Sequence, residues 1–329
     1  MFGPHQQNRT AIFDYAKGTM FEPIDKEDWK EAKYLAKATA MVLVTVREHL
    51  VNTHLIVANV ATRASTIELP PNHPIRRLLT IFTFRTTEVN IGAFALLVPE
   101  NSLLHRGTAF THDAMKEVFD SAYTESIAFN PFYRREYIPE LIKLSNDNKF
   151  PYIDQGEEYY DIIQSFVSEW IKKSGGQAED EQAMNFYNAI KESTKGQAYE
   201  IPDYKSQGDM IHVCSQIIFT VTAYHELVGT VVDYSCLPNR AGFRVCENGQ
   251  SNDLQSFLIQ AMITATTNVG IPLLDSKFDH FFGVGGAPDW EMTLWGRFRT
   301  GLKNQSKRVQ AEDVLRDIEF KNFDPCNFE

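Results

Sequence analysis

Residues 25–63 read DKEDWKEAKYLAKATAMVLVTVREHLVNTHLIVANVATR, and this stretch decides the expected fold. Apolar side chains recur in it at three- and four-residue intervals, the spacing that places them on one side of an α-helix. Asp25 stands where an N-cap is expected, and Leu69-Pro70 ends the pattern, because proline lacks the N–H that a helix needs. The stretch is apolar on more than one face, so we predict a long helix buried in the middle of the protein.

Residues 208–234, GDMIHVCSQIIFTVTAYHELVGTVVDY, predict a second, strongly apolar helix. Strand patterns are few. We therefore predict an all-α fold in which both central helices carry histidines, with an irregular arm over residues 1–26 and one helical domain over residues 27–329. Further helices are expected at about 112–125, 135–145, 157–173, 182–194, 252–267 and 291–320.

Composition limits the possible partners and the cellular location. The formal net charge is −11 and no run rich in Lys or Arg is present, which argues against nucleic acid and anionic membranes. The longest apolar stretches are too short or too polar to span a bilayer. The four cysteines fit neither a CxxC zinc site nor a disulfide framework, and no signal peptide is visible. We therefore expect a soluble, cytoplasmic protein without an integral membrane segment.

A series of short motifs resembles the lipoxygenase family in order and spacing. Individually they are modest, but together they cover about Phe21 to Asn322. The motifs are Trp29-Lys30-Glu31-Ala32-Lys33, His49-Leu50-Val51-Asn52-Thr53-His54, Ala61-Thr62-Arg63, His73-Pro74-Ile75, Val89-Asn90-Ile91, Thr220-Val221-Thr222-Ala223-Tyr224-His225, Pro238-Asn239 and Leu315-Arg316-Asp317-Ile318-Glu319-Phe320-Lys321-Asn322.

This resemblance implies the C-terminal, iron-binding part of a lipoxygenase catalytic domain, without the family's N-terminal β-sandwich. It also implies a ligand set for one non-haem iron between two long helices. Two histidines five residues apart lie on the first helix, and one histidine lies on the second. The side chain four residues after that histidine and a C-terminal carboxylate complete the set.

Two registers fit the first helix. Counting from Trp29 without gaps places the first ligand on Val44 and the second on His49. The alternative pairs His49 with His54, but residues five apart on an α-helix point about 140° from each other, so both can bind only at a π-bulge. We prefer the first register, which makes His54 and His73 structural residues.

The second helix then supplies His225, and the position four residues later is Gly229. We find no counterpart of the family's C-terminal tail, so two of five ligands remain. Our first hypothesis is therefore an enzyme with no cofactor and no metal, a cyclase or isomerase for a long apolar polyene or fatty chain. His225 and His49 would move protons. The expected substrate-binding residues are Val44, Gly229, Tyr224 and Asp233.

Two other hypotheses stay open. In one, the protein is an iron-dependent dioxygenase for a polyunsaturated lipid, with Asp233 adding a carboxylate to His49 and His225 to make a facial triad. In the other, it binds an apolar lipid without catalysis. The sequence does not indicate an oligomeric state.

Overall fold

In the computed structural model, the chain divides into two compact units. One unit contains Met1–Glu48, Ile91–Phe119 and Val228–Val269, and the other contains His49–Asn90, Asp120–Leu227 and Gly270–Glu329. The predicted single domain over residues 27–329 stays a prediction. The described residues are 11–14, 18–108, 110–130, 151–229, 246–247, 250–251, 254, 258, 261–262 and 288–315.

The all-α prediction is confirmed in the described parts of the chain, where strands are confined to two small antiparallel hairpins. In the first, β1 (Ile12–Asp14) pairs with β2 (Thr19–Phe21), and Phe13 lies opposite Met20. The second joins β3 (Cys246–Glu247) to β4 (Gln250–Ser251). Within the predicted irregular arm over residues 1–26, the first hairpin thus contains two short strands, and the arm as a separate region stays a prediction.

Helix α1 (Glu27–Leu43) begins with Glu27 and Asp28, whose negative charges suit the positive end of the helix dipole. The prediction that Asp25 caps this helix is wrong. Asp25 ends a preceding 3₁₀ turn, η1 (Pro23–Asp25), and its Oδ2 accepts a hydrogen bond from the backbone N–H of Glu22 at 2.6 Å. Lys26, at φ +49°, separates this turn from the helix.

The helical path then runs on to Glu68 through η2 (Val44–Ala58) and α2 (Asn59–Glu68). Segment η2 is a π-helix, in which the backbone hydrogen bonds join residues five apart. The path ends where predicted, because Leu69 is extended before Pro70. Leu50, Val51 and Val57 are at most 4% exposed, so this central part of the helix is buried, as its apolar sequence predicted.

The second predicted central helix is also present up to residue 229. It comprises α10 (Gln207–Phe219), a π segment η5 (Thr220–Tyr224) and α11 (His225–Gly229). Asp209 accepts a hydrogen bond from the backbone N–H of Ser206 and so caps α10. Every residue from 213 to 224 is buried, which is typical of a helix surrounded by protein on all sides.

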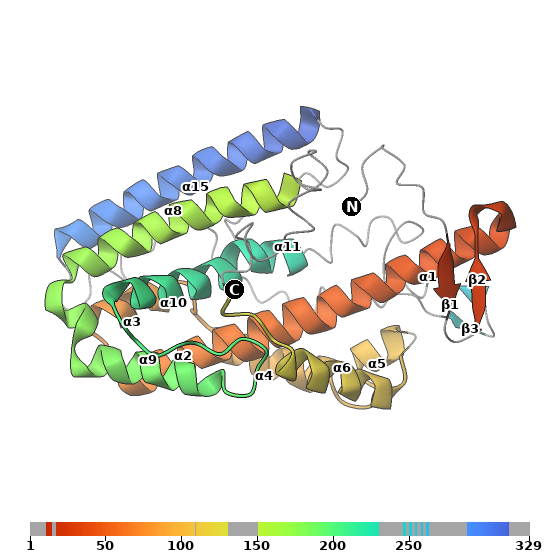
Figure 1. Ribbon diagram of the computed structural model, residues 1–329, viewed down its shortest axis with the longest axis horizontal. Coiled ribbons are helices and arrows are strands. Elements are labelled where there is room, and N and C mark those ends of the chain that lie inside the picture. The colour runs from red at the N-terminus through yellow and green to blue at the C-terminus, as the bar shows by residue number, and fades with distance from the viewer. Residues whose placement is uncertain are drawn as a thin grey trace. The chain divides into compact units, whose positions relative to one another are not determined.

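Helix α8 (Pro151–Lys173) packs against both α10 and α15 (Asp289–Leu315) in the larger unit. Figure 1 shows α8 beside α15, where Phe166 stacks on Phe298 with ring centroids 4.2 Å apart. The helices predicted at 112–125 and 182–194 are confirmed as α6 (His112–Thr124) and α9 (Glu181–Ser193), and those at 135–145 and most of 252–267 lie outside the described residues. The other helical elements are α3 (Pro74–Thr80), α4 (Thr86–Leu97), α5 (Leu103–Gly107) and η4 (Gly175–Glu179).

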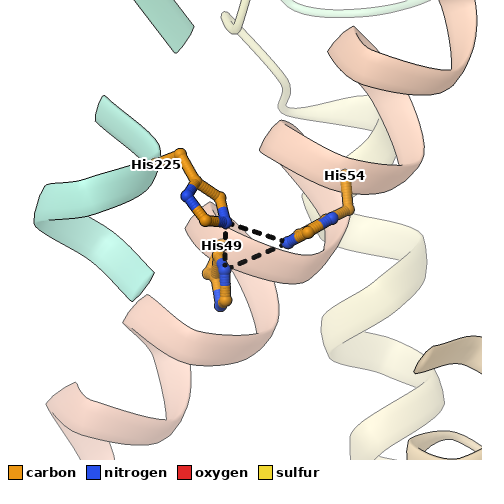
Figure 2. A group of neighbouring side chains, drawn as sticks. All are labelled: His49, His54 and His225. Carbon is orange, nitrogen blue, oxygen red and sulfur yellow. Dashed lines mark hydrogen bonds between the residues drawn. The ribbon is translucent and has the colours of Figure 1, made fainter. Parts of the chain in front are cut away.

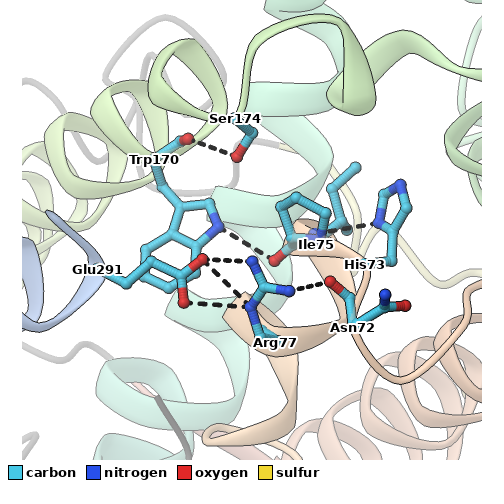
Figure 3. Close-up of polar contacts among 8 residues, drawn as sticks. Asn72, His73, Ile75, Arg77, Trp170, Ser174 and Glu291 are labelled. Carbon is cyan, nitrogen blue, oxygen red and sulfur yellow. Dashed lines mark hydrogen bonds and ion pairs between the residues drawn. The ribbon is translucent and has the colours of Figure 1, made fainter. Parts of the chain in front are cut away.

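A buried polar cluster links α3 to α8 and α15 (Figure 3). Arg77 donates from Nε to both carboxylate oxygens of Glu291, at 3.1 and 3.2 Å, and Glu291 is fully buried. The Trp170 indole N–H donates to the Pro74 carbonyl at 3.0 Å. His73 caps α3, since its Nδ1 accepts from the Ile75 N–H at 3.2 Å while its Nε2 lies 3.0 Å from the Gln177 carbonyl. The predicted structural role of His73 is confirmed.

In the described parts of the chain, no helix combines the length and the apolar character that crossing a membrane requires.

Candidate metal centre

Three histidines in the larger unit bring their Nε2 atoms together (Figure 2). The Nε2 of His49 lies 3.0 Å from that of His225 and 3.0 Å from that of His54. The third side of the triangle, from His225 to His54, is 3.3 Å. The three rings are steeply tilted to one another, so that they approach one another through their Nε2 atoms and do not stack.

The π-helix explains why His49 and His54 face the same point. On an α-helix their five-residue spacing would turn them about 140° apart, whereas in η2 it equals the hydrogen-bond step of the helix. Our preferred register, with Val44 and His49 as the pair, is therefore corrected in favour of the pair His49 and His54. His54 lies in the cluster rather than outside it.

Hydrogen bonds among the three rings cannot satisfy all three nitrogens. Each Nε2 presents either a proton or a lone pair in the plane of its ring. With one proton in the triangle, two lone pairs face each other at about 3 Å, and with two protons, two N–H groups do so. One edge of the triangle is therefore repulsive in either state, and a central cation would remove the conflict.

The triangle also has the size of a metal site. Two ligands at right angles around a metal about 2.1 Å away lie about 3.0 Å apart, and a tetrahedral angle gives about 3.4 Å. The observed edges of 3.0, 3.0 and 3.3 Å fall within these values. Imidazole is a suitable donor for iron, zinc and copper. The arrangement thus fits a cation held on one face by His49, His54 and His225.

The protonation of the His54 ring is set by a neighbouring amide. Asn90 Oδ1 lies 2.8 Å from His54 Nδ1. Exchanging the oxygen and nitrogen of the Asn90 amide would lose two hydrogen bonds. Its Nδ2 donates to the His54 carbonyl at 2.9 Å and to Asn59 Oδ1 at 2.8 Å. His54 Nδ1 is therefore the donor, and its Nε2 presents a lone pair to the triangle.

Burial keeps the cluster uncharged. It is the largest cause that holds the pKa of His49 well below its usual value, and the neighbouring His54 and His225 rings add to the effect. Burial, followed by the His54 ring, lowers the pKa of His225 to about 3. Both rings are neutral at pH 7, which is the state that binds a metal ion.

None of the other predicted site residues belongs to the histidine triangle, and one lies outside the described residues. Val44 begins η2, is 38% exposed and offers no ligand atom. Tyr224 is buried beside His225 in the sequence, and Gly229 is half-buried four residues after it. Asp233 lies outside the described residues, so its role stays a prediction. Within the described ranges, no carboxylate joins the three histidines.

Sequence analysis missed Asn59 and Asn90. Asn59 left a signal, since His49, His54 and Asn59 follow one another at five-residue intervals, which is the hydrogen-bond step of a π-helix. Asn90 belongs to the Val89-Asn90-Ile91 motif, but a contact between residues 36 positions apart could not be read from one sequence.

Comparisons with known proteins show which proteins this chain resembles. No protein-family model matches the chain. The chain is 24% identical to the polyunsaturated fatty acid lipoxygenase ALOX15B of Rattus norvegicus, over 65% of its own length and 33% of that protein. It is 25% identical to the hydroperoxide isomerase ALOXE3 of Homo sapiens, over 64% of its own length and 30% of that protein. The chain thus spans about a third of the length of these relatives.

Solved structures show the same fold. Coral 8R-lipoxygenase superposes with a TM-score of 0.74 at 15% identity, over 94% of this chain and 50% of that one. The fungal lipoxygenase of Fusarium graminearum gives a TM-score of 0.67 at 17% identity, over 92% of this chain and 51% of that one. The fold is therefore that of lipoxygenases. Together with the sequence likeness, it identifies the chain as a lipoxygenase relative.

Proposed function

We propose that this protein binds one non-haem metal ion, iron in the first place, on His49, His54 and His225, and acts as an enzyme on a polyunsaturated lipid. The observation that carries the proposal is the convergence of three Nε2 atoms within 3.3 Å of one another. Our hypothesis of a metal-free cyclase or isomerase rested on Val44 as the first ligand position. The triangle pairs His49 with His54 instead of Val44, and it therefore favours the iron-dependent alternative. His54 takes the place of Asp233 as the third proposed metal ligand.

The three histidines would act as neutral ligands on one face of the ion. The buried rings need not lose a proton at pH 7 to bind, because the pKa values of His49 and His225 are already lowered. Asn90 would hold the His54 ring in the orientation and tautomer that binding requires. A bound iron that changes between two oxidation states would supply one-electron chemistry.

Two comparisons support a fatty-chain substrate. The relatives include polyunsaturated fatty acid lipoxygenases of rat and human, and a lipoxygenase of similar fold, with a TM-score of 0.72, has been solved in complex with arachidonate. The helix that leads to His225 is apolar and buried from Val213 to Tyr224, so apolar groups lie next to the proposed ligands in the sequence. This setting suits a hydrocarbon chain better than a polar metabolite.

The test is reconstitution followed by turnover. Metal-free protein is loaded anaerobically with Fe²⁺, mixed with arachidonate in air, and followed by oxygen uptake and product analysis. We expect product only from the iron-loaded parent. His54→Ala should be inactive, and His212→Ala should match the parent because His212, on α10, bonds to Tyr160 and lies outside the triangle.

Two outcomes would contradict the proposal. Equal turnover of a polyunsaturated chain by metal-free and iron-loaded protein would return the account to acid–base catalysis by His49 and His225. Tight binding of arachidonate, without product in either state, would favour the non-catalytic lipid-binding alternative.

A further inference from the structure

The three histidines differ in what holds their outward-facing nitrogens. His54 Nδ1 lies 2.8 Å from Asn90 Oδ1. In contrast, His225 Nδ1 is buried and has no hydrogen-bond partner among the described residues. An imidazole that can rotate or exchange its tautomer is a poor metal ligand, because only one ring nitrogen then presents a lone pair at the right place. The side chain of Asn90 thus fixes the orientation of the His54 ring, whereas no such contact holds the outward-facing nitrogen of His225 in the described structure.

We infer that Asn90 is the positioning residue of the metal centre, and that Asn59 in turn holds Asn90. The inference rests on the proposed function and deepens it. Asn90 is 3% exposed, and each atom of its amide group has a partner. Its Oδ1 fixes the proton on His54 Nδ1, while its Nδ2 bonds to the His54 carbonyl and to Asn59. One amide thus forms hydrogen bonds to both the ring and the backbone carbonyl of the same proposed ligand.

The path of the chain explains why these two contacts of Asn90 with His54 are needed. His49, His54 and Asn59 follow one another at the hydrogen-bond step of the π-helix, and Asn90 approaches from α4. A π-helix is rarely stable by itself, so a second element that binds the His54 carbonyl helps to hold the register in which His49 and His54 converge. Asn90 therefore has two effects on the site, one on the tautomer and one on the backbone.

Substitutions of Asn90 separate the tautomer effect from a structural one. Asn90→Leu removes the acceptor at similar size. Asn90→Asp keeps an acceptor for His54 Nδ1–H but loses the donor to the His54 carbonyl. Asn59 can reverse its own amide to donate to the new carboxylate. The matched control is Tyr187→Phe, which deletes a hydrogen bond of another buried side chain in the same unit, the one from the Tyr187 hydroxyl to the Pro202 carbonyl at 3.1 Å.

The measurement is Co²⁺ affinity by competition with a chelator, with the visible absorption of bound Co²⁺ as a spectroscopic signature. Loss of an outer partner of a metal-bound histidine typically lowers affinity about 10- to 100-fold. We expect this loss for Asn90→Leu, a smaller loss for Asn90→Asp, which keeps the acceptor for His54 Nδ1–H, and no change for Tyr187→Phe. Asn59→Leu should fall between Asn90→Leu and the parent.

A second readout covers the case in which Asn90→Leu folds poorly. Nitrogen NMR of histidine-labelled, metal-free parent should show His54 protonated at Nδ1. A proton on Nε2 overturns the inference, as does parental Co²⁺ affinity in Asn90→Leu or an equal loss in Asn90→Asp. If the parent itself takes up no metal, the proposed function fails and the inference falls with it. If the parent binds and Asn90→Leu binds equally well, the inference alone fails.

Discussion

Two buried polar clusters of the larger unit differ in how their polar groups are paired. Around Arg77 and Glu291, each group meets its opposite: a guanidinium faces a carboxylate, and the Trp170 N–H faces a carbonyl (Figure 3). Around His49, His54 and His225, three like groups face one another (Figure 2). In the first cluster each donor faces an acceptor, whereas in the second no placement of protons satisfies all three Nε2 atoms.

This difference supports a structural role for the first cluster and the proposed metal-binding role for the second. A buried polar group without a partner costs free energy, and a bound cation would satisfy the three nitrogens of the triangle. The Arg77 cluster joins α3, α8 and α15 and needs nothing further. We therefore expect changes in the Arg77 cluster to affect stability alone, and changes in the triangle to affect metal binding.

The largest effect on stability is expected from Arg77→Ala. It leaves the fully buried Glu291 carboxylate without its partner, and breaking a buried ion pair in this way costs about 3–5 kcal/mol. Chemical denaturation should show this loss, while Co²⁺ affinity of the folded fraction stays parental. The control Arg85→Ala, in an exposed pair with Glu88, should leave the midpoint unchanged. A large loss of metal affinity in Arg77→Ala would contradict the separation of the two clusters.

Lowering the pH should destabilise the metal-free protein through the triangle. The pKa values of His49 and His225 are lowered in the folded state, so below about pH 6.5 the unfolded chain binds more protons than the folded one. The contribution of these histidines to the free energy of unfolding is therefore fully present above that pH. It decreases as the pH falls, by roughly 1.4 kcal/mol per pH unit for each such histidine.

Urea denaturation between pH 7.5 and 5 measures this slope. The double variant His49→Ala, His225→Ala should have a shallower slope than the parent, with a remaining contribution from His73, whose pKa burial also lowers. Equal slopes in the two proteins would mean that the triangle takes up protons as readily when folded as when unfolded.

Trp170→Phe should have a smaller effect. The variant keeps an aromatic ring beside Phe166 and Trp290 but removes the N–H that donates to the Pro74 carbonyl. A loss of about 1–3 kcal/mol is expected, because a buried carbonyl is left without that donor. Thermal denaturation with and without Co²⁺ should show the same metal-induced shift as in the parent. A smaller shift would link the two clusters.

The sequence predicted the two central helices and two of the three histidines in the triangle, but it misplaced the third. The stretch from Val44 to Ala58 has an apolar pattern that an α-helix also satisfies, and the choice of a π-helix depends on packing and on distant contacts such as Asn90 to the His54 carbonyl. For this reason the Val44 register looked preferable and His54 looked structural. The β1–β2 hairpin escaped prediction because three-residue strands carry too little pattern.

The central claim is that the triangle of His49, His54 and His225 holds one metal ion, and metal stoichiometry tests it most directly. The protein is purified from iron-supplemented culture without chelators, and its metals are measured by elemental analysis beside His49→Ala, His54→Ala, His225→Ala and the His212→Ala control. The account predicts about one equivalent of metal in the parent and the control, and little in the three triangle variants. A parent free of metal both as purified and after anaerobic reconstitution would contradict it, as would full metal content in His54→Ala.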